Sequence, residues 1–245
     1  MNKYPQLAKP PLREALIDLQ LVEPLPSSFV DTLKERTLKG YDNVQPIRKG
    51  QFSLRFGPQL PAQATVEKEE LFGRRYESRD KTSVVQIRRD GVTYSVLRGY
   101  TQWNEIQSAA QAIWKQYCEW AGPVKVGRLA VRYINVIELP PGVIDFDEYL
   151  TASPRVPPRL PQTVVNFLQR VVLRVSDAGT TAIVTQALEP PTQSHIPVVL
   201  DIDVFTPCSL EGQSSELWAR LEKLRELKNM IFFSSVTDRA LESYR

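Results

Sequence analysis

Apolar residues alternate with polar ones over several stretches of this chain, and this alternation predicts β-strands. The first strand contains Ala15, Ile17, Leu19 and Leu21 and is ended by prolines. Further strands are predicted at residues 51–56, 71–77, 85–96, 126–139, 168–175, 180–188 and 198–205. Asp90-Gly91 interrupts the stretch 85–96 and predicts a tight hairpin, because both turn positions must tolerate positive φ.

Two longer stretches carry apolar residues at helical spacing instead. In the first, Trp103–Ala121, the apolar positions are Ile106, Ala110, Ile113, Tyr117 and Trp120. In the second, Ser215–Ile231, the residues predicted to face inward are Leu217, Leu221, Leu224 and Leu227. Short helices are predicted after a cap at Ser27 or Ser28, over Phe146–Leu150, and from Thr237.

The order of these elements repeats along the chain. Residues 1–123 and residues 124–245 each predict a strand, a short helix, several more strands and then a long helix. This order predicts an α+β fold with two similar halves, each an antiparallel sheet packed by a long helix. One continuous domain is the alternative to two. The layout is similar to the saddle of the TATA-binding protein or to a helix-grip fold, which suggests binding without identifying a ligand.

The composition is that of an ordinary globular protein, and it requires no particular partner. The chain has 245 residues, of which 42% are hydrophobic, and a net charge of +3. Neither a nucleic acid nor a membrane is demanded by that charge. No signal peptide or membrane-spanning run is recognised. Cys118 and Cys208 lie far apart without a CxxC motif, which favours a reduced cytoplasmic setting.

Candidate catalytic and metal-binding residues are few. Asp201 and Asp203 lie on one face of a strand and could hold a divalent cation, but ion pairs with Arg170 and Arg174 explain them as well. His195 is the only histidine, and no nucleophile motif accompanies it, so a surface loop is the better interpretation. Phosphate-binding glycine loops are absent from the sequence. We therefore predict no metal, no cofactor and no catalytic residue.

Two groups of polar residues are better candidates for binding. Arg74, Arg75, Arg88 and Arg89, with tyrosines between them, could follow a nucleic-acid backbone. Neighbouring acidic residues make the region nearly neutral, which favours a solvated, salt-bridged sheet face over a nucleic-acid surface. Asn135 and Arg132 are polar residues on opposite, largely apolar faces of one strand. Asn135 either lines a pocket or satisfies a backbone group at a bulge, and Arg132 needs a carboxylate from Glu14, Asp18, Asp201 or Asp203.

The sequence resembles a sporadically distributed, conserved-hypothetical prokaryotic family of about this length. The resemblance covers most of the chain and is most specific in the RYIN segment. It rests on PPLREALIDLQL, YTQWNEIQSAAQAIWKQY, VGRLAVRYINVIELP, LDIDVF and LKNMIFFSSVTDRALESY. It implies no activity and no functional residues. The patchy distribution implies a setting among mobile genes, including phage-defence or toxin-linked operons.

We therefore expect a non-enzymatic interaction or regulatory protein in such a defence or mobile-element system, with a protein partner encoded nearby. Nucleic-acid binding through the arginine-rich sheet is the first alternative. A small-ligand sensor or enzyme with a pocket near Arg132 and Asn135 is the second. A homo-oligomer stays open, and no membrane partner is expected.

Overall fold

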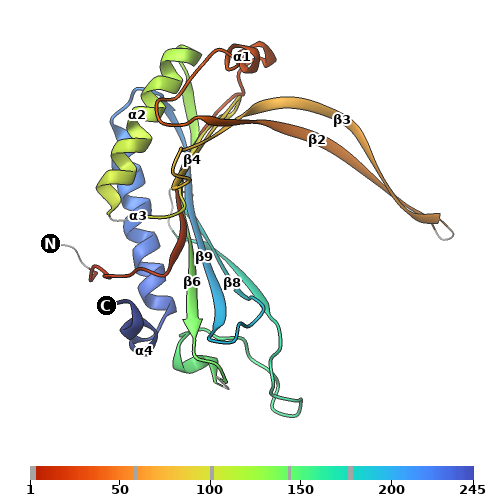
Figure 1. Cartoon of the computed structure of the whole chain (residues 1–245), viewed down its shortest axis with the longest axis vertical. Coiled ribbons are helices and arrows are strands. Elements are labelled where there is room, and N and C mark those ends of the chain that lie inside the picture. Colours follow the sequence, from red (N-terminus) through yellow and green to blue (C-terminus); the bar gives the residue numbers. More distant parts are fainter. Residues whose placement is uncertain (1–3, 58–59, 100–101, 143–144, 176–178) are drawn as a thin grey trace.

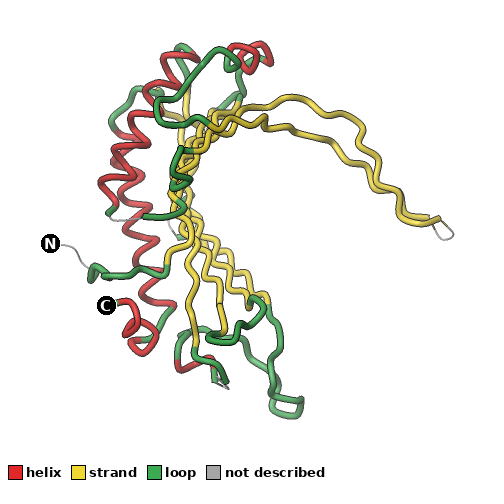
Figure 2. Tube along the Cα trace, viewed as in Figure 1, coloured by secondary structure: helices red, strands yellow, loops and turns green. Residues whose placement is uncertain are grey.

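The protein is built on one large antiparallel sheet (Figures 1 and 2). The computed structural model describes residues 4–57, 60–99, 102–142, 145–175 and 179–245, and for residues 51–57 and 60–68 it describes the backbone alone. The described residues form nine strands in the order β2-β3-β4-β5-β1-β6-β9-β8-β7. With helices covering part of this sheet, the fold class is α+β, as predicted.

The order of the strands places the first and second parts of the chain on opposite sides of a central pair. The early strands are β1 (Leu12–Leu21), β2 (Asn43–Gly57), β3 (Leu60–Glu77), β4 (Ser83–Arg88) and β5 (Gly91–Val96). The later strands are β6 (Lys125–Leu139), β7 (Leu168–Arg174), β8 (Thr181–Leu188) and β9 (Ile196–Glu211). β1 pairs with β6 at the centre, β5 returns beside β1, and β9 returns beside β6.

Two long helices cover one face of the sheet. α2 (Trp103–Ala121) packs on β1 and β5, and α3 (Glu216–Ser235) packs on β6 and β9. Figure 1 shows both on the same side, so we call the other side the open face. The remaining helical segments are α1 (Ser27–Thr32), η1 (Phe146–Glu148), α4 (Asp238–Leu241) and η2 (Glu242–Tyr244). In the described part of the chain, no helix has the length and apolar character needed to cross a membrane.

The short elements test the predicted start and stop signals. Thr237 caps α4, and its side chain accepts a hydrogen bond from the Ala240 backbone N–H at 3.3 Å, as predicted. The prediction for α1 was wrong, because Pro26 occupies the cap position without a side-chain bond and both serines lie inside the helix. Proline is tolerated there because its fixed φ suits the start of a helix.

The predicted hairpin between β4 and β5 is confirmed, but its two-residue turn is Arg89-Asp90, because Gly91 already pairs with Arg88 as the first residue of β5. The expected positive φ at Asp90 was wrong, since Lys81 is the one non-glycine residue with positive φ in the described part of the chain. Gly91 has φ +140°, which favours glycine. A Cβ atom at this position would also lie only 2.0 Å from the backbone oxygen of Leu19. The first position of β5 therefore needs glycine for two reasons, its dihedral angle and the close approach of β1.

β2 and β3 are much longer than the predicted strands. β4 pairs with β3 only from Gly73 to Glu77, so the rest of the β2–β3 hairpin has no neighbouring strand in the described sheet. We call this free part, Arg48–Gly57 with Leu60–Leu71, the arm. Figures 1 and 2 show it curving away over the open side of the sheet. Two paired strands without a third are marginally stable alone, which makes the arm unusual.

Candidate functional site

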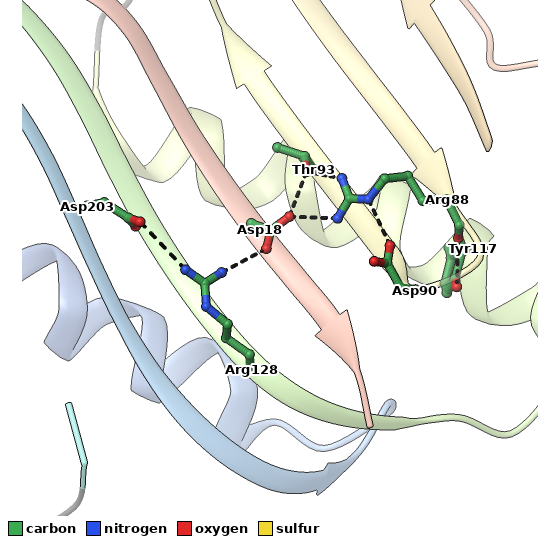
Figure 3. A network of polar contacts seen from close by, with 7 residues as sticks. All are labelled: Asp18, Arg88, Asp90, Thr93, Tyr117, Arg128 and Asp203. Carbon is green, nitrogen blue, oxygen red and sulfur yellow. Dashed lines mark hydrogen bonds and ion pairs between the residues drawn. The ribbon is translucent and has the colours of Figure 1, made fainter. Parts of the chain in front are cut away.

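The open face carries a chain of ion pairs centred on a buried carboxylate (Figure 3). Asp18 on β1 is 7% exposed. Its Oδ1 accepts hydrogen bonds from the Arg88 guanidinium at 2.9 Å and from the Thr93 hydroxyl at 2.6 Å. Its Oδ2 accepts one from Arg128 at 3.1 Å. Two arginines from different strands thus share one carboxylate.

The same network, here called the Asp18 network, extends to further carboxylates at both ends. Arg88 Nε donates to Asp90 Oδ1 at 2.9 Å, and Arg128 lies 3.6 Å from Asp203 Oδ2. The carboxylates outweigh desolvation and raise the pKa of Arg88, although desolvation is the largest single influence and opposes them. Burial raises the pKa of Asp203. The Asp18 network therefore links β1, β4, β5, β6 and β9 across the middle of the sheet.

Arg132 pairs with Asp201, one of its four predicted partners. Its guanidinium donates two hydrogen bonds to the Asp201 carboxylate, at 2.8 and 2.6 Å, and these bonds raise the pKa of Arg132. Paired bonds of this kind fix orientation as well as charge. Asp201 and Asp203 are thus held by Arg132 and Arg128. The suggested pairing with Arg170 and Arg174 was wrong, because β8 lies between β7 and β9.

The four arginines of the predicted nucleic-acid surface do not form one patch. Arg74 and Arg75 are neighbours on β3 and therefore point to opposite faces. Arg75 pairs with Glu77 at 2.8 Å, and Arg89 donates to the Leu25 carbonyl at 2.6 Å. Arg88 belongs to the Asp18 network. Nucleic-acid binding through these residues stays a prediction, with little free positive charge to drive it.

Asn135 lies on the helix-covered face, away from Arg132, and has both a backbone partner and a place on a cavity wall. It is 4% exposed, and its amide donates to the Leu200 carbonyl at 3.0 Å. Its partner strand β1 has a register irregularity between Leu12 and Glu14. Asn135 also lines a cavity of about 660 Å³ between β6, α3, the start of α2 and the segment before β1. Arg132 does not line this cavity.

A buried lysine from α3 lines the same cavity and was missed by the sequence analysis. The buried positions of α3 include Leu217, Leu221, Leu224, Lys228 and Ile231. The predicted inward position Leu227 is only half-buried. Burial, together with the nearby charge of Arg225, lowers the pKa of Lys228 to about 7. The spacing of 4, 3, 4 and 3 residues along this row was the signal that could have identified Lys228.

The remaining candidates have ordinary surroundings. His195 lies in a loop, with the Ser194 hydroxyl 3.0 Å from Nδ1 and Glu138 3.8 Å from Nε2. Burial raises the pKa of the Cys118 thiol to about 11 and also raises that of Cys208, which disfavours thiolate chemistry. In the parts of the chain with described coordinates, no three His, Cys, Asp or Glu residues are grouped to hold a metal ion.

No protein-family model matches this chain, and no curated protein matches it in a sequence search. The candidate sites therefore rest on geometry. The open face carries a connected set of ion pairs, and the arm curves over its side. The helix-covered face has a cavity lined by a buried amine.

Proposed function

We propose that this protein is a non-enzymatic interaction protein that holds a protein partner between its arm and its open face. The observation that supports this proposal is that the two strands of the arm pair only with each other. The neighbouring strand β4 pairs with β3 from Gly73 to Glu77 and does not reach the arm in the described sheet. An isolated two-stranded ribbon is marginal in water, and its outer edges leave backbone groups free to pair. A partner that packs against the arm would supply the contacts that a third strand normally gives.

The charges of the open face favour a protein partner over a nucleic acid. Binding to nucleic acid draws on cations that displace counterions from phosphates. Arg88, Arg128 and Arg132 are each engaged by carboxylates of the same face. Releasing Arg88 would take a buried partner away from Asp18, and breaking a buried pair costs about 3–5 kcal/mol in general.

We further propose that residues 1–123 and 124–245 are two versions of one layout joined along the β1–β6 contact. In support, the last strand of each set returns beside its first strand, and a long helix follows each set. A saddle of this kind presents two different halves to a partner. From the family resemblance we propose a bacterial phage-defence, toxin-linked or mobile-element setting, with the partner encoded nearby.

The arm can be removed without disturbing the sheet. Lys49 and Glu70 are paired residues near its base, so an Asn-Gly turn between them would close a shorter hairpin. We expect this variant to retain its free energy of unfolding to within about 1 kcal/mol, because the deleted pairs touch no third strand. Both proteins would be tagged and used for affinity capture from nuclease-treated host cells, followed by reconstitution with the purified partner.

The matched control is Arg220→Ala, which removes an exposed α3 side chain paired with Glu216. We expect a stoichiometric protein partner with the full-length protein and with the control, and at least a tenfold loss of affinity with the shortened arm. Equal affinity of the shortened and full-length proteins would rule out the arm as the docking element. Capture that disappears with nuclease treatment would point to nucleic acid instead.

A further inference from the structure

Cationic side chains outnumber carboxylates around the cavity beside Asn135. Lys223, Arg225 and Lys228 line it, against one lining carboxylate, Glu226. Arg225 is already paired with Glu222 at 2.5 Å. Among the described residues, no carboxylate lies within 4.0 Å of the Lys228 ammonium. The cavity therefore contains a buried cation without an anionic partner.

The surroundings of Lys228 leave bonding capacity unused. The side chain is 7% exposed, and its ammonium donates to Asn229 Oδ1 at 2.5 Å. The ammonium also lies 3.7 Å from the centroid of the Tyr133 ring, a cation–π contact. An ammonium has three donors, so one amide oxygen does not satisfy it. Buried charges of this kind are normally paired.

A second feature of the cavity also favours an anion. Gln102, Trp103 and Asn104, at the start of the 19-residue helix α2, line the cavity. No side chain within the described residues caps this end. The first backbone N–H groups of a helix lack partners within it and carry partial positive charge. The helix end and the buried lysine thus come from different elements and favour the same kind of ligand.

The other walls are apolar and aromatic. Trp103, Tyr133, Phe232 and Leu12 contribute rings and aliphatic surface. The volume of about 660 Å³ lies within the usual range of small-molecule sites. One buried ammonium matches a single negative charge. A phosphate dianion would carry more negative charge than this one ammonium offsets, and Arg225 is already engaged by Glu222.

We propose that this cavity binds an amphipathic carboxylate, with the carboxylate on Lys228 and the apolar body against Trp103, Tyr133 and Phe232. This site is separate from the arm and the open face, so it adds a small-ligand function to the proposed partner binding. Its test does not depend on any partner.

The probe is 2-naphthoate, and the matched neutral probe is 2-naphthamide, which has nearly the same shape. Isothermal titration calorimetry at pH 6.5 measures both dissociation constants. We expect the wild-type protein to bind the carboxylate at least about tenfold more tightly than the amide. Absence of binding, or equal binding of the two probes, would overturn the proposal.

Lys228→Met keeps an unbranched side chain, one atom shorter than lysine, and removes its charge. We expect this variant to lose the preference for the carboxylate while its affinity for the amide changes by less than about threefold. Lys115→Met is the matched control, because Lys115 is an exposed lysine of α2 that does not line the cavity. A carboxylate preference retained by Lys228→Met, or lost in Lys115→Met, would contradict the assignment to Lys228.

The pH dependence of the wild-type protein provides a readout without mutation. The other charged and titratable groups of the cavity wall are Lys223, Arg225 and Glu226 from α3, Tyr133 from β6 and Tyr4 from the segment before β1, and of these the Tyr133 ring lies 3.7 Å from the Lys228 ammonium. Because burial lowers the pKa of Lys228 to about 7, the amine loses its proton as pH rises above that value. We expect affinity for 2-naphthoate to fall about tenfold per pH unit above it in the wild type and to stay flat in Lys228→Met. A flat wild-type profile between pH 6.5 and about 8.5 would refute the ion pair.

Discussion

The two faces of the sheet treat buried charge differently. On the open face, Asp18 is nearly buried and receives hydrogen bonds from Arg88, Arg128 and Thr93. On the helix-covered face, Lys228 is equally buried, at 7% exposure, but has an amide oxygen and an aromatic ring instead of a carboxylate. In the first arrangement each charge has a partner of opposite sign, and in the second the described residues place no carboxylate beside the ammonium.

This difference separates a structural role from a binding role. A connected network of buried ion pairs orients the strands that supply it, and removal of its central member, Asp18, takes a buried partner from both arginines. A buried charge without a counter-ion instead costs stability in every folded molecule. Groups of this kind beside a cavity are typical of functional sites. We therefore expect opposite changes in the free energy of unfolding. It should fall when Asp18 is neutralised and rise when Lys228 is neutralised.

The largest effect is expected for Asp18→Asn. The substitution preserves shape but leaves Arg88 and Arg128 facing a neutral amide, with Arg88 side-chain exposure of only 12%. We expect the free energy of unfolding to fall by about 3–5 kcal/mol, measured by urea denaturation.

Asp31→Asn is the control for this experiment, because its pair with Lys34 is exposed on the surface. Exposed pairs of this kind contribute about 0–1 kcal/mol. If Asp18→Asn were no more destabilising than this control, the Asp18 network would not organise the open face.

The second prediction is that Lys228→Met stabilises the protein. The folded-state pKa of about 7 lies below the ordinary value of 10.5, so the unfolded chain binds more protons between these limits. Stability of the wild type therefore rises as pH increases from 7 to 10.5, and the penalty of the buried charge is fully present below 7. We expect a gain on the order of 3 kcal/mol at pH 6.5 that shrinks by pH 9.5.

Thermal unfolding of both proteins across that pH range measures this gain. Lys223→Met, at an exposed position of the same helix, should leave stability within about 0.5 kcal/mol of the wild type at each pH. A destabilised Lys228→Met at pH 6.5 would mean that the lysine has a compensating partner in the folded state.

Local signals were sufficient for most elements of the fold. Alternation identified β1 and β6, and Asp90-Gly91 identified the β4–β5 hairpin, because these features depend on neighbouring residues. Asn135 was recognised as a binding candidate for the same reason, since an amide on an apolar face is visible in the sequence.

Features that depend on distant residues were not predictable. Arg88 and Asp18 are separated by 70 positions, so their pairing follows from strand order. The arm was missed because its register depends on β3 continuing past β4, which no turn signal marks. Lys228 was overlooked because lysines usually lie outside, and only the spacing of the buried row places it inward.

The smallest effect is expected at the Arg132–Asp201 pair, which lies between the two extremes. It has two good hydrogen bonds, but 41% of the Arg132 side chain is exposed, so solvent screens the interaction. A double-mutant cycle with Arg132→Met and Asp201→Asn, measured by urea denaturation, should give a coupling energy of about 1 kcal/mol. A coupling as large as that between Asp18 and Arg88, measured with Asp18→Asn and Arg88→Met, would show that the whole open face acts as one buried network. A coupling near zero would confine the structural role to the Asp18 network and leave Arg132 free to exchange its carboxylate for one on a partner.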